Sequence, residues 1–199
     1  MFEVAEYIGI IAAAMSGFFV AVRVKLDLLG VLVASFLSAL GGGLIRDVIA
    51  DRRPFAFSHD LPAFVILAVV ILLIAFKFHK KDSFENRSIF VLSDSIGLVS
   101  FSISGALIAM EANLNFTGVL ALAFITAVGG GILRDVIINE VPLLFKTGFY
   151  GMVALFMGLS LFILDCFEFV NYYSIGVVFI LGVVLRMVAF YKKWSMPLP

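Results

Sequence analysis

Seven apolar stretches follow one another along the chain, each with about the 17 to 25 residues that a helix needs to cross a membrane. Hydrophobic residues make up 63% of the 199 residues and charged residues only 14%, which is too little polar surface to cover a water-soluble protein. We therefore predict an all-α integral membrane protein with seven transmembrane helices. The predicted spans cover about residues 4–22, 28–53, 61–76, 89–110, 116–137, 148–164 and 174–190.

The composition also narrows the functional classes. The formal net charge is zero, which gives no indication of a nucleic-acid partner. The single cysteine, Cys166, excludes a disulfide framework, and the loop residues His59 and His79 have no second ligand at metal spacing. Since the sequence shows no nucleophile–base pair and no phosphate-binding loop, we expect neither an enzyme nor a bound metal or cofactor.

The first three stretches are repeated by the next three. Gly41 corresponds to Gly129 and Pro54 to Pro142, an offset of 88 residues. Because each unit contains an odd number of spans, the second unit must cross the membrane in the opposite direction to the first. We predict one three-helix unit in residues 1–88, a second, inverted unit in 89–172, and a seventh helix with a short tail in 173–199.

Each unit carries three glycines followed by an Arg-Asp pair inside its second span. Glycine in a helix interior costs about 1 kcal/mol relative to alanine, and a charge in the bilayer costs about 2.5 kcal/mol or more unless it is paired or wetted. The glycines either let two helices cross tightly or break the helix, so that free backbone groups face a solute. We favour the broken helix because charges follow within one turn. The residues concerned are Gly41, Gly42, Gly43, Arg46 and Asp47, and Gly129, Gly130, Gly131, Arg134 and Asp135.

Partners for these charges are predicted from the topology. Arg46 and Asp47 are neighbours in sequence and point about 100° apart on a helix, so we expect them not to pair with each other. The predicted ion pairs join Glu6 to Arg46 and Asp94 to Arg134, and they act either as structural links between helices or as gates at the two mouths of a pathway.

Small residues lie opposite the glycine-rich spans. Ser16-Gly17 and Ser104-Gly105 are expected to allow close helix packing, and lining a polar path is their less favoured role. Arg186 in the last span is expected to reach the lipid headgroups or to pair with Asp135 or Asp94.

Positive charges gather in alternate loops. With the N-terminus outside, almost all lysines and arginines of the loops lie on the cytoplasmic side, so we predict this orientation, with a cytoplasmic C-terminus. The predicted cytoplasmic residues are Arg23, Lys25, Lys77, Lys80, Lys81, Arg87, Lys146, Lys192 and Lys193, and the outer loops carry Arg52 and Arg53.

Two tandem units of this form, with an acidic residue, Ser-Gly, Asp or Asn, the motif Gly-Gly-Gly-x-x-Arg-Asp-Val and a proline, resemble the bacterial membrane family named for its glycine-transporter domain. That family is distantly similar to the trimeric intracellular cation (TRIC) channels. The resemblance covers about residues 6–190. It implies a homotrimer in a bacterial inner membrane, with inverted repeats and one pathway in each protomer, lined by the two glycine triplets and the two Arg-Asp pairs. Glu6 stands where the second unit has Asp94, so the two mouths need not be equivalent.

Three functions remain open. The first is transport of a small zwitterion such as glycine, whose carboxylate meets backbone N–H groups and whose ammonium meets carbonyls. The second is a channel for monovalent cations, in which the arginines near the glycines must be neutralised. The third is a non-transport scaffolding or lipid-binding role. We favour small-solute transport and rank glycine slightly above cations because of the family name.

Overall fold

The computed structural model describes residues 1–80, 83–146 and 149–194, and all regular structure in these residues is helical. Lys81 lies outside the described residues, as do the side chains of Lys80 and Arg87. The elements are α1 (Phe2–Arg23), α2 (Leu28–Ile49), α3 (Phe55–Ser58), α4 (Leu61–Ala75), η1 (Phe78–Lys80), α5 (Ser83–Glu111), α6 (Phe116–Ile137), α7 (Leu143–Lys146), α8 (Tyr150–Cys166) and α9 (Tyr172–Tyr191).

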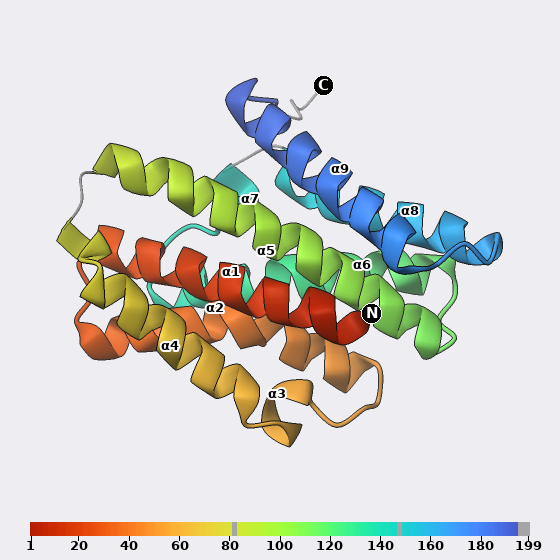
Figure 1. Cartoon of the computed structure of the whole chain (residues 1–199), viewed down its shortest axis with the longest axis horizontal. Helices are drawn as coiled ribbons and strands as arrows, with labels where there is room; N and C mark the ends of the chain where they lie inside the picture. The colour runs from red at the N-terminus through yellow and green to blue at the C-terminus, as the bar shows by residue number, and fades with distance from the viewer. Residues whose placement is uncertain (81–82, 147–148, 195–199) are drawn as a thin grey trace.

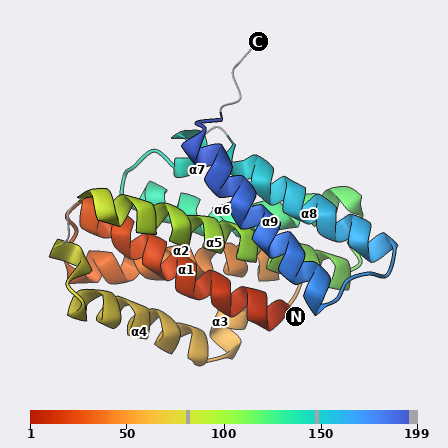
Figure 2. The same cartoon turned by 45° about the horizontal axis from the view of Figure 1, so that its top comes forward.

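Four long helices form the centre of the molecule. α1 packs against α2 and α5, and α6 packs against α2 and α5, so the four enclose a common core. α4 lies against α1 on one side of this core, and α8 and α9 lie against α5 on the other (Figure 1). The same arrangement is visible after a rotation of 45° (Figure 2). The centre therefore contains equivalent helices from both predicted units.

Five of the described helices are long and apolar enough to cross a membrane, namely α1, α2, the part of α5 from Ser88 to Glu111, α6 and α9. α4 and α8 are apolar but have only 15 and 17 residues. Helix length and composition thus give five candidate spans, and the count of seven stays a prediction. Large apolar side chains are exposed along α4 and α9, as expected for surfaces that contact lipid.

The two halves have matching helix boundaries because equivalent residues begin and end the helices. The Asp27 side chain accepts a hydrogen bond from Gly30 N at the start of α2, and Asn115 accepts one from Gly118 N at the start of α6, each at 2.8 Å. After α2 and α6, the chain turns at Asp51 and Asn139, both with positive φ angles. α1 and α5 run in opposite directions (Figure 1), as the inverted repeat predicts.

The expected helix breaks are absent. α2 and α6 are α-helical through their glycine triplets, so this prediction is wrong. The triplets instead allow the two helices to cross with their backbones in contact. A Cβ atom on Gly42 would collide with the Thr126 carbonyl oxygen, and one on Gly130 would lie 2.5 Å from the Ser38 carbonyl oxygen. The tight-crossing interpretation of the glycines therefore describes this structure.

Candidate functional site: a buried charge network at the helix crossing

Arg46 of α2 is the centre of the first charged cluster, and it is completely buried. Its Nη1 and Nη2 atoms both donate to the carboxylate of Glu6 on α1, the latter at 3.1 Å. Nη1 also donates to the Ser104 hydroxyl of α5 at 3.0 Å. The structure thus contains the predicted Glu6–Arg46 ion pair. This pair links α1 to α2, and the Ser104 contact adds a third helix.

Each arginine also binds the aspartate that follows it. Arg46 Nε donates to Asp47 Oδ1 and Arg134 Nε donates to Asp135 Oδ1, both at 2.8 Å. The expectation that sequence neighbours do not pair was wrong, because the long arginine side chain bends back although its Cβ points elsewhere. The Nε–H donor of each guanidinium is therefore satisfied by a carboxylate on the same helix.

The second carboxylate oxygen of each aspartate holds the chain beyond the helix. Asp47 Oδ2 accepts from Phe55 N at 2.7 Å, and Asp135 Oδ2 accepts from Leu143 N at 2.9 Å. Phe55 and Leu143 are the first residues of α3 and α7, where backbone N–H groups have no partner within the helix. Each aspartate therefore connects a buried arginine to the start of the short helix that follows its own helix.

Arg134 of α6 is the centre of the second cluster, where the predicted Asp94–Arg134 contact is indirect. Arg134 Nη1 donates to Ser16 Oγ of α1 at 3.2 Å, and Ser16 Oγ donates to Asp94 Oδ1 of α5 at 3.0 Å. Asp94 has one methylene fewer than its counterpart Glu6, so the serine hydroxyl bridges the remaining gap. Arg134 Nη1 also donates to Ser38 Oγ of α2 at 3.3 Å.

The Ser-Gly pairs have two separate roles. Gly17 and Gly105 permit close packing, since an added Cβ would lie 2.6 Å from the Ala34 carbonyl oxygen and 2.7 Å from the Leu122 carbonyl oxygen, respectively. Ser16 and Ser104, by contrast, are partners of buried charges. Sequence reasoning missed Ser38. Its equivalence to Thr126, three residues before each glycine triplet, was the signal available.

Arg186 of α9 is buried beside the second cluster. Its guanidinium carbon lies 4.8 Å from the centre of the Tyr150 ring, a cation–π contact. Arg186 interacts electrostatically with Asp94, one of its two predicted partners, although no direct ion pair forms. Its Nε atom is buried without a hydrogen-bond partner among the described residues.

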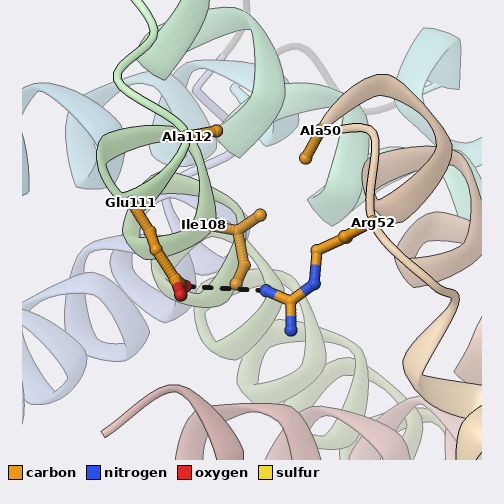
Figure 3. Close-up of a pocket in the computed structure, with 5 residues that line it drawn as sticks. All are labelled: Ala50, Arg52, Ile108, Glu111 and Ala112. Carbon is orange, nitrogen blue, oxygen red and sulfur yellow. Dashed lines mark ion pairs between the residues drawn. The ribbon is translucent and has the colours of Figure 1, made fainter.

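A cavity of about 350 Å³ opens at one end of the core, which we call the Glu111 end. It lies between the end of α5 and the turn after α2, and Arg52 and Glu111 face each other across it (Figure 3). The Arg52–Glu111 ion pair measures 3.6 Å, and Arg52 Nε lies 3.8 Å from Asp47 Oδ1. The cavity therefore adjoins the first charged cluster. Its lining residues are Ala50, Arg52, Ile108, Glu111 and Ala112.

The buried charges do not balance. Among the described residues four carboxylates and three guanidinium groups are buried, so the interior carries an excess of one negative charge when all are ionised. No group of three or more potential metal ligands lies together within the described ranges. The excess of one carboxylate among the buried ionised groups favours a single positive charge. The buried charged residues are Glu6, Arg46, Asp47, Asp94, Arg134, Asp135 and Arg186.

Three solved structures share this architecture. A chain from a structural study of conductance through TRIC cation channels aligns with a TM-score of 0.85 and 33% identity, covering 100% of this chain and 97% of that one. A prokaryotic TRIC channel crystallised in 0.5 M KCl aligns at 0.89 with 26% identity, over 98% of both chains. The TRIC orthologue from Rhodobacter sphaeroides aligns at 0.88 with 25% identity, over 97% of this chain and 98% of that one. The fold is that of the TRIC channels.

Sequence relatives are bacterial membrane proteins. The UPF0126 membrane protein YvgT of Bacillus subtilis is 33% identical over 195 residues, 98% of this chain and 95% of that protein. A UPF0126 membrane protein of Deinococcus radiodurans is 42% identical over 137 residues, which are 69% of this chain and 63% of that protein. The inner membrane protein YadS of Escherichia coli is 29% identical over 154 residues, 77% of this chain and 74% of that protein.

The sequence model of the family described as Glycine transporter matches residues 3–80 and 91–165, one match for each half of the chain. The resemblance inferred from the doubled motif is therefore confirmed, and the family and the fold support a role in membrane transport or conduction. The chain belongs to the Glycine transporter family of bacterial membrane proteins and has the fold of the TRIC channels.

Proposed function

We propose that this protein lets small monovalent cations cross the membrane through the core of each protomer, between α1, α2, α5 and α6. The observation that carries the proposal is the excess of buried carboxylates over buried guanidinium groups. In a medium of low dielectric constant, an uncompensated negative charge strongly attracts a cation. The similarity to proteins named as cation channels supports the same choice.

The pathway follows the residues around the α2–α6 crossing. The glycine triplets bring the backbones of α2 and α6 into contact, and each triplet is followed on its helix by an arginine that binds acidic partners. Both arginines are neutralised by neighbouring carboxylates, which removes the repulsion that free guanidinium groups would exert on a cation. Glu6 and Asp94 then serve as the acidic groups that a cation meets nearest the centre.

Glycine or a similar zwitterion is the second candidate. The family description favours it, and Arg52 and Glu111 place opposite charges on facing walls of one cavity. The mechanism first expected for it needs backbone N–H groups freed by helix breaks. Since α2 and α6 are continuous, these donors are already bonded within the helices, and the cation becomes the better candidate.

Flux measurements in liposomes separate the candidates. Purified protein should give voltage-driven K⁺ flux that excess glycine does not reduce, and empty liposomes should give none. D94N should lower this flux, because the amide can still accept the hydrogen bond from Ser16 but carries no charge. D165N makes the same chemical change at an exposed site and should leave the flux unchanged.

Two other outcomes of the liposome experiment would favour the alternative functions. Saturable uptake of labelled glycine without K⁺ flux would replace the cation by the zwitterion. Neither activity from intact, monodisperse protein would favour a scaffolding or lipid-binding role.

The assembly and orientation are part of the same proposal. We propose a homotrimer in a bacterial inner membrane with the N-terminus outside, supported by the TRIC neighbours, the inner membrane relative and the loop charges. Light scattering in detergent should give the mass of three chains. A green fluorescent protein fused to the C-terminus should fluoresce, because that domain matures in the cytoplasm and not after export. A monomeric mass or a dark fusion would overturn the respective statement.

A further inference from the structure

Arg52 is held more loosely than the arginines of the core. Its side chain is 33% exposed, and its two acidic neighbours, Glu111 at 3.6 Å and Asp47 at 3.8 Å, lie beyond hydrogen-bond distance. Arg46, by contrast, is fully buried and bound at 2.8 to 3.1 Å by several acceptors. The long Arg52–Glu111 pair is exposed and contributes little to stability, and the buried Asp47 carboxylate binds Arg46 more closely than Arg52, so another cation can compete with the Arg52 guanidinium.

Two carboxylates and an aromatic ring surround the Arg52 guanidinium. Its guanidinium lies between the surface carboxylate of Glu111, whose side chain is 73% exposed, and the buried carboxylate of Asp47. Phe2 covers it from a third direction, with the guanidinium carbon 5.2 Å from the ring centre. The cavity of about 350 Å³ beside it leaves room for the side chain to move aside (Figure 3).

The opposite end of the core carries the reverse charges. By the offset of 88 residues, Arg52 corresponds to Glu140 and Glu111 corresponds to Arg23. Glu140 interacts electrostatically with Arg23 and forms an ion pair of 3.0 Å with Lys146. Where Arg52 adjoins Asp47 at one end, a carboxylate therefore stands at the equivalent position of the other end. A tethered cation beside the first buried aspartate is a feature of the Glu111 end.

We propose that the position of the Arg52 guanidinium, between Glu111 and Asp47 at the edge of the cavity, is a binding site for a monovalent cation, and that this guanidinium occupies the site as a tethered competitor. A cation that enters the core displaces Arg52 toward the open cavity and takes its place between the two carboxylates. Asp47 Oδ1 already accepts from Arg46 Nε, and its second lone pair is available to the cation. This site is placed on the proposed pathway and so rests on the proposed function, but its occupancy can be measured without transport.

Removal of the competitor tests the site. R52Q should bind K⁺ more tightly than the wild type, with a half-saturating concentration at least about fivefold lower, the change that one unit charge at about 4 Å produces in water. R53Q loses the same charge at the neighbouring exposed residue and should behave as the wild type, as should R52K, which keeps the charge. Adding E111Q to R52Q should remove the gain.

Binding is read from the thermal unfolding temperature in detergent, titrated with KCl against N-methyl-D-glucamine chloride at constant ionic strength. Equal half-saturation in R52Q and R53Q would overturn the inference. If R52Q does not give folded protein, R52S carries the same prediction. K⁺ flux measured in parallel separates the two proposals: flux with unchanged binding rejects only the site, and tighter binding in R52Q without any flux rejects only the proposed function.

Discussion

Ser104 of α5 accepts a hydrogen bond from Arg46 of α2 at 3.0 Å, so a hydroxyl from the second half of the chain binds the arginine of the first. The reciprocal contact joins Ser16 to Arg134 at 3.2 Å. The two serines occupy equivalent positions, and each contributes to the charged cluster centred on the other half's arginine. The halves are therefore joined by exchanged polar contacts as well as by the glycine crossing.

These two serines should differ in their contribution to stability. Ser16 is the link between Arg134 and Asp94, whereas Arg46 binds Glu6 directly without the help of Ser104. S16A should therefore lower the free energy of unfolding by about 1 to 3 kcal/mol, the cost of unsatisfied buried polar groups, and S104A by less. Thermal unfolding in the same detergent gives the comparison. An equal loss in the two variants would contradict the bridging role of Ser16.

Two glycines of the triplets should also differ in how much their replacement by alanine changes the free energy of unfolding. G42A should destabilise the protein by about 3 kcal/mol or more, because the new methyl group meets the Thr126 carbonyl of a packed helix and neither backbone can move alone. G131A is the matched control, since its Cβ would come no closer than 3.9 Å to the Arg134 side chain. It should be neutral or stabilising by up to about 1 kcal/mol. Unfolding temperatures test both, and a tolerated G42A would reject the tight crossing.

Arg46 should be required for folding. R46M leaves the buried carboxylate of Glu6 without its counter-charge and leaves Asp47 with only the longer contact to Arg52 at 3.8 Å, and removing one partner of a buried pair costs about 3 to 5 kcal/mol. The double variant E6Q/R46M should recover part of this loss, because it removes a stranded charge. The yield of monodisperse protein is the measurement. Full assembly of R46M alone would indicate a gate that is dispensable for structure.

The ion pair of Glu140 should respond to pH. The hydrogen bond and positive charge of Lys146, followed by the charge of Arg23, lower the pKa of Glu140 below its usual 4.5. Because the pKa is lowered, the contribution of this ion pair to the free energy of unfolding is complete above pH 4.5. It is lost as the pH falls through the lower pKa of Glu140 in the folded state. The difference in unfolding temperature between the wild type and E140Q should therefore be constant near neutral pH and vanish in acid. A difference that grows on acidification would contradict this sign.

The Glu6–Arg46 contact could be predicted because topology alone places both residues at one end of the core. The Arg46–Asp47 contact could not, since helix geometry fixes the direction of a Cβ atom and not the path of a long flexible side chain. The choice between a broken helix and a tight crossing depended on how closely α6 approaches α2. That distance is set by tertiary packing, which no local pattern in the sequence encodes.

The Arg52–Glu111 ion pair at the Glu111 end could not be predicted from the sequence, for a different reason. Arg52 and Glu111 occupy positions whose equivalents are Glu140 and Arg23, so the repeat conserves an interaction while exchanging its signs. Identical residues at the offset of 88 include the glycines and the Arg-Asp pair. They do not include pairs in which the positive and negative residues have exchanged positions. The Asp94–Arg134 bridge through Ser16 was likewise hidden, because it depends on the difference of one methylene between Asp94 and Glu6.

Asp47 holds the Arg46 guanidinium with one oxygen and the Phe55 amide with the other. A shift of the short helix α3 away from the core therefore either breaks the Asp47–Phe55 hydrogen bond or rotates the carboxylate and weakens its bond to the Arg46 guanidinium. A fluorescent dye attached to α3 would therefore report rearrangements around Arg46. A dye attached at Arg46 itself would disrupt the packing, because that side chain is fully buried. Asp135 and α7 provide the same readout for the other half.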